Sequence, residues 1–158
     1  MQRIFLPIAT CILLLAALLR FGGLASYPPG PHFDEAANIL ITRSIAFGGA
    51  NQFPITNSYQ GRETLYHYLA APLFQTIADD EFTLQLTSAF IGILTVAVSM
   101  TLGRVLFRGE RGVIVGLLMG ILLTVSFHHV LMSRQAYRAI TLPLMQGIGL
   151  LFLWRGLR

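Results

Sequence analysis

Two adjacent carboxylates, Asp34 and Glu35, are the residues of this sequence best placed to do chemistry. They lie within residues 27–40, a stretch that reads YPPGPHFDEAANIL and follows the first long apolar run. Only 11% of the residues are charged, so neighbouring acids just outside an apolar run are unusual. The prolines before them lack N–H donors and fix φ, which makes this segment stiff and extended. The sequence therefore predicts a reactive site at Asp34 and Glu35.

A purely structural role is the alternative for the same residues. Aspartate is a common N-cap, and Asp34 stands where a helical run to residue 47 begins. Glu35 would then favour the helix through its dipole. His32, next to a proline, fits a surface loop as well as a binding site. The residues alone leave both interpretations open.

The composition is that of a membrane protein. The 158 residues are 54% hydrophobic, and the mean hydropathy is +0.67. Every basic residue is an arginine, and the formal charge of +4 is spread without a run of like charge, so a nucleic-acid partner is not expected. Cys11 is the only cysteine, which excludes an intramolecular disulfide and a cysteine metal site. We expect an all-α membrane fold.

Four apolar segments are long enough to position these residues as membrane spans. The predicted spans of the single domain 1–158 are residues 4–24, 82–103, 112–128 and 139–155. A span needs about 20 residues, and the first reaches that length if Arg20 snorkels to the surface. The alternative for the first segment is a cleaved signal peptide. Its apolar run exceeds the usual ~7–15 residues of such peptides, which favours an anchor.

The predicted external loop, residues 25–81, contains two amphipathic helices. The first covers residues 34–47, with Ala37, Leu40 and Ile41 along one side. The second covers residues 61–78 and is expected to lie at the membrane interface, where tyrosine is favoured. Its apolar residues recur every four positions: Leu65, Leu69, Leu73 and Ile77. On this interpretation Tyr66, His67 and Tyr68 are interfacial anchors.

Residues 128–138 read as a polar connection on the same side of the membrane. It contains the pair His128 and His129, which we interpret as interfacial because neighbouring helical residues point about 100° apart. Arg134 and Arg138 would share one face if the segment is helical.

Small residues and arginines predict packing and orientation. Gly112, Gly116 and Gly120 repeat at four-residue spacing, a pattern typical of close helix packing in lipid. The tight turn at 104–111 carries three arginines against one acid, which places it in the cytoplasm by the positive-inside rule. Both termini are then cytoplasmic, and residues 25–81 and 128–138 meet on the outer side.

Three motifs in order resemble the beginning of the membrane glycosyltransferases of the GT-C fold. They are P-x-G-P-H-F-D-E-A in the first external loop, Y-Q-G-R-E-T-L-Y-H-Y-L before the second span, and S-R-Q-A-Y-R after the third. The sequence is most similar to bacterial relatives of the protein O-mannosyltransferases and the lipid A aminoarabinose transferase. The resemblance covers nearly all of this chain, but members of the family usually continue with many more spans.

The resemblance implies sugar transfer from a polyprenyl-phosphate donor at the outer face of the bacterial cytoplasmic membrane. Asp34, with Glu35, would serve as the general base for the acceptor hydroxyl. Positive charge for the departing phosphate would come from Arg134 and Arg138, with Arg62 as a third candidate. The substrate-binding residues implied are Arg62, Glu63, Tyr66, Arg134 and Arg138. His32, Asp34 and Glu35 can alternatively hold a divalent metal ion.

Two classes of function follow. The first is a transferase, or the N-terminal portion of one, whose partners are the lipid-linked sugar and membrane lipids. The second is a non-catalytic transmembrane subunit, derived from such an enzyme, that packs within a larger membrane complex. Four spans can hardly enclose both a lipid-linked sugar and an acceptor, which keeps the second class open.

Overall fold

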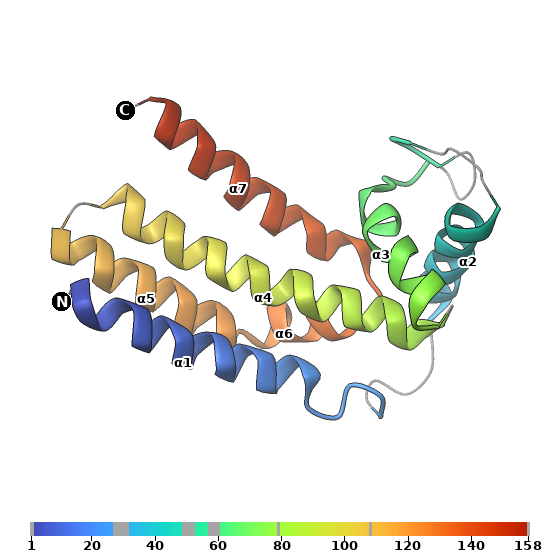
Figure 1. The fold of residues 1–158 in the computed structure, drawn as a ribbon, viewed down its shortest axis with the longest axis horizontal. Coiled ribbons are helices and arrows are strands. Elements are labelled where there is room, and N and C mark those ends of the chain that lie inside the picture. The colour runs from blue at the N-terminus through green and yellow to red at the C-terminus, as the bar shows by residue number, and fades with distance from the viewer. Residues whose placement is uncertain are drawn as a thin grey trace.

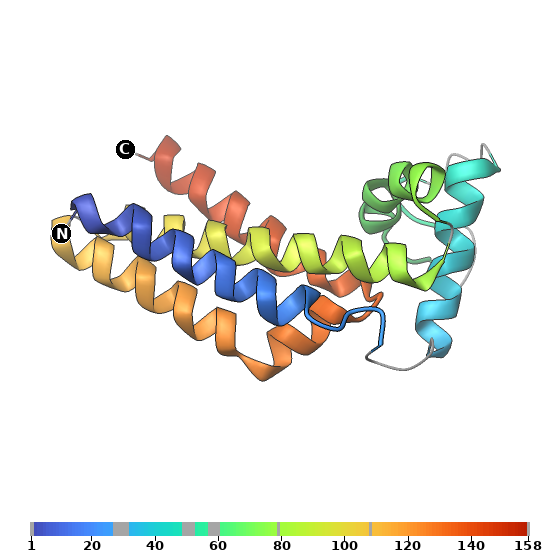
Figure 2. The same cartoon turned by 60° about the horizontal axis from the view of Figure 1, so that its bottom comes forward.

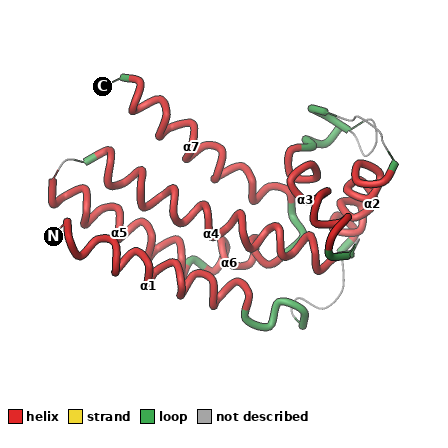
Figure 3. Tube along the Cα trace, in the orientation of Figure 1, coloured by secondary structure: helices red, strands yellow, loops and turns green. Residues whose placement is uncertain are grey.

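The protein is built from α-helices in the part of the chain that the computed structural model describes, residues 2–26, 32–48, 53–56, 61–78, 80–107 and 109–157. The helices are α1 (Gln2–Phe21), α2 (Phe33–Phe47), α3 (Leu65–Thr76), α4 (Glu81–Leu106), α5 (Gly109–Val125), α6 (Phe127–Arg134) and α7 (Thr141–Gly156), with a 3₁₀ turn, η1 (Arg138–Ile140), before α7. Within these ranges there is no strand, only an isolated bridge between Ile55 and Glu63 (Figure 3).

Three of the described helices are long and apolar enough to cross a membrane. They are α1, α4 and α7 together with η1. A fourth candidate is the pair α5 and α6, which passes the same test as one unit but is bent by 61° at Ser126. The all-helical class and the membrane character predicted from the sequence are confirmed at this level.

The long helices lie along one another, and the two short helices α2 and α3 gather at one end. Figures 1 and 2 show α1 and α5 beside α4, with α7 inclined on another side of α4. Both termini and the α4–α5 turn lie at the end opposite to α2 and α3 (Figure 1). The described parts of the segments 25–81 and 128–138 therefore meet at the same end of the bundle.

The glycine stripe of α5 packs against α4. A Cβ added to Gly116 would lie 2.5 Å from the carbonyl oxygen of Met100, and one added to Gly103 would lie 2.9 Å from Gly116 Cα. Such distances leave no room for a side chain, so the two backbones touch. The predicted close packing is confirmed, and the partner helix belongs to this chain.

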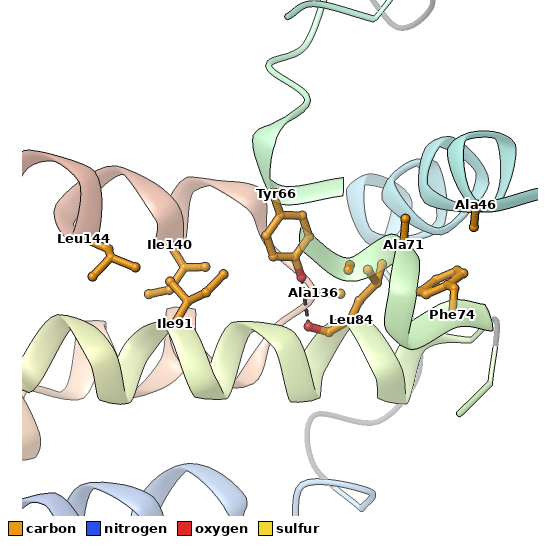
Figure 4. Close-up of a cluster of buried hydrophobic side chains, with 10 residues drawn as sticks. Ala46, Tyr66, Ala71, Phe74, Leu84, Ile91, Ala136, Ile140 and Leu144 are labelled. Atoms are coloured by element: carbon orange, nitrogen blue, oxygen red, sulfur yellow. Dashed lines mark hydrogen bonds between the residues drawn. The ribbon is translucent and has the colours of Figure 1, made fainter. Parts of the chain in front are cut away.

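Two buried apolar clusters hold the helices together. One joins α1, α4 and α5, and it includes Phe5, Ala9, Ile12 and Ala16, which recur at helical spacing along α1. The other joins α3, α4 and α7 (Figure 4). At its centre the hydroxyl of Tyr66 donates to the carbonyl oxygen of Leu84 over 2.9 Å. This second cluster fixes α3, and through Ala46 also α2, on the bundle.

The segment after the third predicted span differs from the prediction. The predicted span 112–128 is a helix from Gly109 to Val125, and most of the predicted polar connection 128–138 is the helix α6. The chain turns at Ser126, whose side chain accepts from the His129 N–H and caps α6.

Arg20 is the clearest error in the predicted span 4–24. The sequence suggested that it snorkels to the surface, but its side chain is fully buried, with 0% exposure. Its guanidinium donates to Ala16 O, Leu123 O, His129 Nδ1 and Ser133 Oγ. Arg20 turns inward because the bend between α5 and α6 leaves these acceptors within its reach. His129 is likewise buried rather than interfacial, whereas His128 is exposed.

The faces of the two short helices also differ from the prediction. In α2 the predicted residues Ala37 and Ile41 are buried, but Leu40 is exposed. The buried face also includes the polar residues Glu35, Asn38 and Thr42. In α3 the buried face includes Tyr66, Ala70 and Phe74, and Leu69 of the predicted apolar stripe is exposed. Tyr66 and His67 are core residues and not interfacial anchors, because Tyr66 packs against α4 and His67 contacts Thr42 of α2.

Candidate functional site

Asp34 is not the N-cap of α2. The cap position is His32, and Glu35 Oε2 accepts a 2.9 Å hydrogen bond from the His32 N–H. Glu35 therefore satisfies one of the open N–H groups at the start of the helix, and Asp34 does not take part in capping. The structural interpretation of Asp34 as a cap is wrong. Residues 27–31, which belong to the predicted reactive stretch, lie outside the described residues.

Asp34 forms an ion pair with Arg62 instead. Arg62 Nη2 lies 2.8 Å from Asp34 Oδ1, and the Asp34 side chain is 51% exposed. Asp34 projects from the first turn of α2, and Arg62 precedes α3 in the segment that hydrogen-bonds with Pro54 and Thr56. Two of the candidate residues, 28 positions apart, thus meet through their charged groups.

A second ion pair joins Glu63 to Arg138. Arg138 Nε lies 2.9 Å from Glu63 Oε1. Partial burial acts to raise the pKa of Glu63, but a backbone hydrogen bond and the Arg138 guanidinium outweigh it, and the pKa lies below its ordinary value. Glu63 is therefore ionised at neutral pH. Since Arg62 and Glu63 are adjacent, the two ion pairs form one charged cluster.

Glu35 is buried and binds backbone groups with both oxygens. Only 2% of the residue is exposed. Its Oε1 accepts a 2.8 Å hydrogen bond from the Ala136 N–H, and Oε2 accepts from His32 as described above. Asn38, one turn further along α2, donates to the Ala136 carbonyl over 2.8 Å. This geometry does not support the predicted catalytic role of Glu35, since the residue is buried and both carboxylate oxygens accept hydrogen bonds from backbone N–H groups.

Arg134 and Arg138 do not form the predicted fork. Arg134 ends α6, and Arg138 begins η1 beyond the non-helical residues 135–137, so they do not share a helix face. The Arg134 guanidinium donates to the carbonyl oxygens of Leu19, Arg20, Gly22 and Gly23 at the end of α1. A cation suits this place because the C-terminus of a helix carries partial negative charge. Arg138 alone points to the charged cluster.

Tyr66 lies beneath the cluster and not in it. The residue is fully buried, and its hydroxyl donates to the Leu84 carbonyl (Figure 4) and also lies 2.8 Å from Ser88 Oγ. Burial raises the pKa of Tyr66 well above its ordinary value, so the hydroxyl stays protonated. Its predicted contact with substrate is not supported, because a side chain inside the α3–α4 interface cannot reach a bound molecule.

His67 is a polar core residue that the sequence did not single out for the site. Its Nδ1 lies 2.8 Å from Thr42 Oγ1, and that hydroxyl donates its single hydrogen to Asn38 O. The imidazole must therefore carry its proton on Nδ1, which leaves Nε2 as an acceptor. Burial lowers the pKa of His67 to about 4, and the positive charge of Arg138 adds to the shift. His67 is neutral at pH 7.

A recognisable signal for this buried network exists in the sequence. Glu35, Asn38 and Thr42 are spaced three and four residues apart, which places three polar side chains on one face of a helix. A polar stripe in a chain this apolar indicates buried hydrogen bonds across an interface. The partners on the other side, such as the N–H and the carbonyl of Ala136, are backbone groups that no residue pattern identifies.

A metal site at His32, Asp34 and Glu35 stays a prediction. Among the described residues no three histidine, cysteine, aspartate or glutamate side chains converge in a way that could hold a metal ion. Glu35 is occupied by two N–H groups and Asp34 by Arg62. As arranged, these residues do not fit a metal ion.

No protein-family model matches this chain, and no curated protein or solved structure matches it.

Proposed function

We propose that this chain is the N-terminal portion of a glycosyltransferase that uses a polyprenyl-phosphate sugar at the outer face of the bacterial cytoplasmic membrane. The observation that carries the proposal is the charged cluster, in which two carboxylates meet two guanidinium groups at one end of the bundle. Its members come from α2, from the segment before α3, and from η1: Asp34, Arg62, Glu63 and Arg138. The proposal also rests on the motifs that resemble the GT-C transferases.

The cluster supplies the two functions that such a transfer needs. The acceptor oxygen bonds to the anomeric carbon while its proton passes to the half-exposed Asp34 carboxylate. The bond from the anomeric carbon to the phosphate oxygen breaks, and the electron pair leaves with the polyprenyl phosphate. Arg62 and Arg138 stabilise the charge that develops there. In the unliganded chain the carboxylates of Asp34 and Glu63 hold these guanidinium groups in place.

An apolar groove supports the proposal that the substrate is lipid-linked. It has a volume of about 440 Å³ and lies between α3, α4 and α7. Its lining includes Leu69 and Leu73, Phe90 and Leu94, and Leu144. Because α3 follows directly after Arg62 and Glu63, one short helix joins the charged cluster to the groove. A molecule with an anionic head and an isoprenoid chain matches both surfaces.

The test is sugar transfer by membranes that carry the longest natural form of the protein. Asp34→Asn keeps the shape of the side chain but removes the base, so transfer should fall by about 10²–10⁴ at normal yield. Asp80→Asn is the matched control, because Asp80 only caps α4 and asparagine caps a helix about as well. Transfer at the parental rate by Asp34→Asn would end the assignment of Asp34.

The second candidate function is a non-catalytic membrane subunit. It is favoured by the exposed apolar surface of α7, which includes Leu142, Leu150, Phe152 and Leu153. Only 17% of the residues of this candidate span are buried. If membranes with the parental protein neither transfer sugar nor bind a polyprenyl phosphate, this candidate replaces the transferase.

A further inference from the structure

The backbone of Ala136 is held by α2 at both its N–H and its carbonyl group. The Glu35 carboxylate accepts a hydrogen bond from the Ala136 N–H, and the Asn38 side-chain amide donates one to the Ala136 carbonyl, each over 2.8 Å. These bonds join parts of the chain about 100 residues apart, and all three residues are buried. Ala136 lies in the break between α6 and η1, two residues before Arg138. We call the bonds of Glu35 and Asn38 to Ala136 the peptide clamp.

We infer that Glu35 and Asn38 are positioning residues, which set Arg138 for an anionic phosphate group by holding the backbone N–H and the carbonyl of Ala136. The inference rests on the proposed function for its ligand, although the clamp itself is a contact of the folded chain. Residues 135–137 are non-helical, so the helical ladder does not fix the direction in which the chain enters η1. The peptide clamp fixes this direction and therefore also the backbone position from which the Arg138 side chain extends.

The chemistry of the clamp explains why a carboxylate and an amide occupy these positions. Glu35 meets two N–H donors, from His32 and Ala136, and only an ionised carboxylate presents two oxygens that both accept. Glutamine would turn an NH₂ group against one of the two donors. Asn38 meets a carbonyl, so it needs a donor, and aspartate would set acceptor against acceptor.

This pairing gives a test that separates positioning from charge. Glu35→Gln removes a negative charge and Asn38→Asp adds one, yet both break the clamp. We expect hydrogen exchange of the amides in residues 135–138 to rise by roughly tenfold or more in each variant, the effect of losing a hydrogen bond to a buried charged group. Glu110→Gln, the same change on an exposed residue at the far end of the bundle, should leave this exchange unchanged.

The link to Arg138 is tested with farnesyl phosphate, a short polyprenyl phosphate. In the parental background both clamp variants should weaken its binding, by roughly tenfold for a lost hydrogen bond to a charged group. In an Arg138→Gln background they should add almost nothing, because a residue that acts only through Arg138 has no effect without it.

Each result decides one part. Unchanged amide exchange in both variants, or opposite effects of Glu35→Gln and Asn38→Asp on binding, would overturn the clamp. Equal losses of affinity with and without Arg138 would overturn its action through Arg138. If the parental protein does not bind farnesyl phosphate, the proposed function fails and so does the phosphate role of Arg138, while the exchange measurement still decides the clamp.

Discussion

Two arginines, Arg20 and Arg134, donate to carbonyl groups across the junction between α1 and the α5–α6 bend. Arg20 of α1 donates to Leu123 O, a carbonyl that the bend at Ser126 deprives of its helical partner. Arg134 of α6 donates in return to carbonyls at the end of α1. Each cation lies where a helix C-terminus concentrates partial negative charge. Neither guanidinium is directed at the charged cluster, although the sequence made Arg134 a candidate for phosphate binding.

Arg134→Gln should destabilise the protein without the loss of binding expected for Arg138→Gln. Glutamine keeps a donor but cannot reach four carbonyls, and we expect a loss of about 2 kcal/mol in the free energy of unfolding. Thermal unfolding in mild detergent measures it, with the exposed Arg111→Gln as the control. An unchanged unfolding midpoint together with lost binding of farnesyl phosphate would show that Arg134 belongs to the binding site.

His67 makes the stability of the protein depend on pH. Its folded pKa of about 4 lies below the ordinary value of 6.5, so the unfolded chain binds a proton first as the pH falls. The stabilising contribution is present above pH 6.5 and is lost progressively between about 6.5 and 4, at no more than about 1.4 kcal/mol per pH unit. His67→Asn keeps a donor for Thr42 but does not titrate. Unfolding midpoints at pH 7.5 and 5.5 should therefore differ less in this variant than in the parent, and an equal difference in both would contradict the assignment.

At the scale of elements, α4 and α5 act as one unit because glycines bring their backbones together. Gly103 of α4 faces Gly116 of α5, and Gly120 faces the Met100 side chain. Small residues let the helices gain dispersion contacts that larger side chains would prevent.

Gly116→Leu should separate the pair and lower the yield and thermal stability in mild detergent. The new side chain would overlap the Met100 carbonyl, a backbone atom that cannot move aside without shifting the helix. We expect a loss of about 1–3 kcal/mol or failure to fold, as for other overpacked positions. Gly149→Leu in α7 is the control, since a Cβ there meets nothing within 4 Å. Parental stability of Gly116→Leu would show that the stripe is not a packing surface.

The sequence predicts the helices well where one period dominates, and poorly where polar groups find partners far along the chain. Hydropathy located α1, α4 and α7, and glycine spacing predicted a close packing face on α5, although it did not identify α4 as the partner. The burial of Arg20 was not predictable, because three of its four acceptors, in Leu123, His129 and Ser133, lie more than 100 residues away, next to a bend whose signal is one serine, Ser126. In the same way Asp34 and Glu35 are equivalent candidates by their position in the sequence. The fold leaves Asp34 half exposed and buries Glu35 against the backbone of Ala136, about 100 residues away.

At the scale of the whole molecule, the polar chemistry is confined to one end. The cluster, the peptide clamp and His67 lie with α2, α3 and η1, while the opposite end holds both termini and the α4–α5 turn (Figures 1 and 2). This segregation fits a bundle whose two ends face different aqueous compartments.

Cysteine labelling in intact cells should find the two ends on opposite sides of the membrane. In a Cys11→Ala background, Phe33→Cys on α2 should react with an impermeant thiol reagent from outside, since Phe33 is well exposed. Glu110→Cys at the α4–α5 turn should react only after the membrane is opened, because its arginine neighbours favour the cytoplasm. Ready labelling of both positions, or the reverse pattern, would contradict the orientation.

The reciprocal placement of Arg20 and Arg134 has a consequence for biosynthesis. Ribosomes make α1 first, yet Arg20 finds Ser133 only after 113 further residues have been added. Until then a guanidinium at the edge of the first span has no protein partner from α6 and must stay near lipid head groups or water. The first helix can therefore settle at its final depth only when α6 arrives. Nascent chains halted before residue 126 should hold α1 less firmly than chains that extend beyond residue 140.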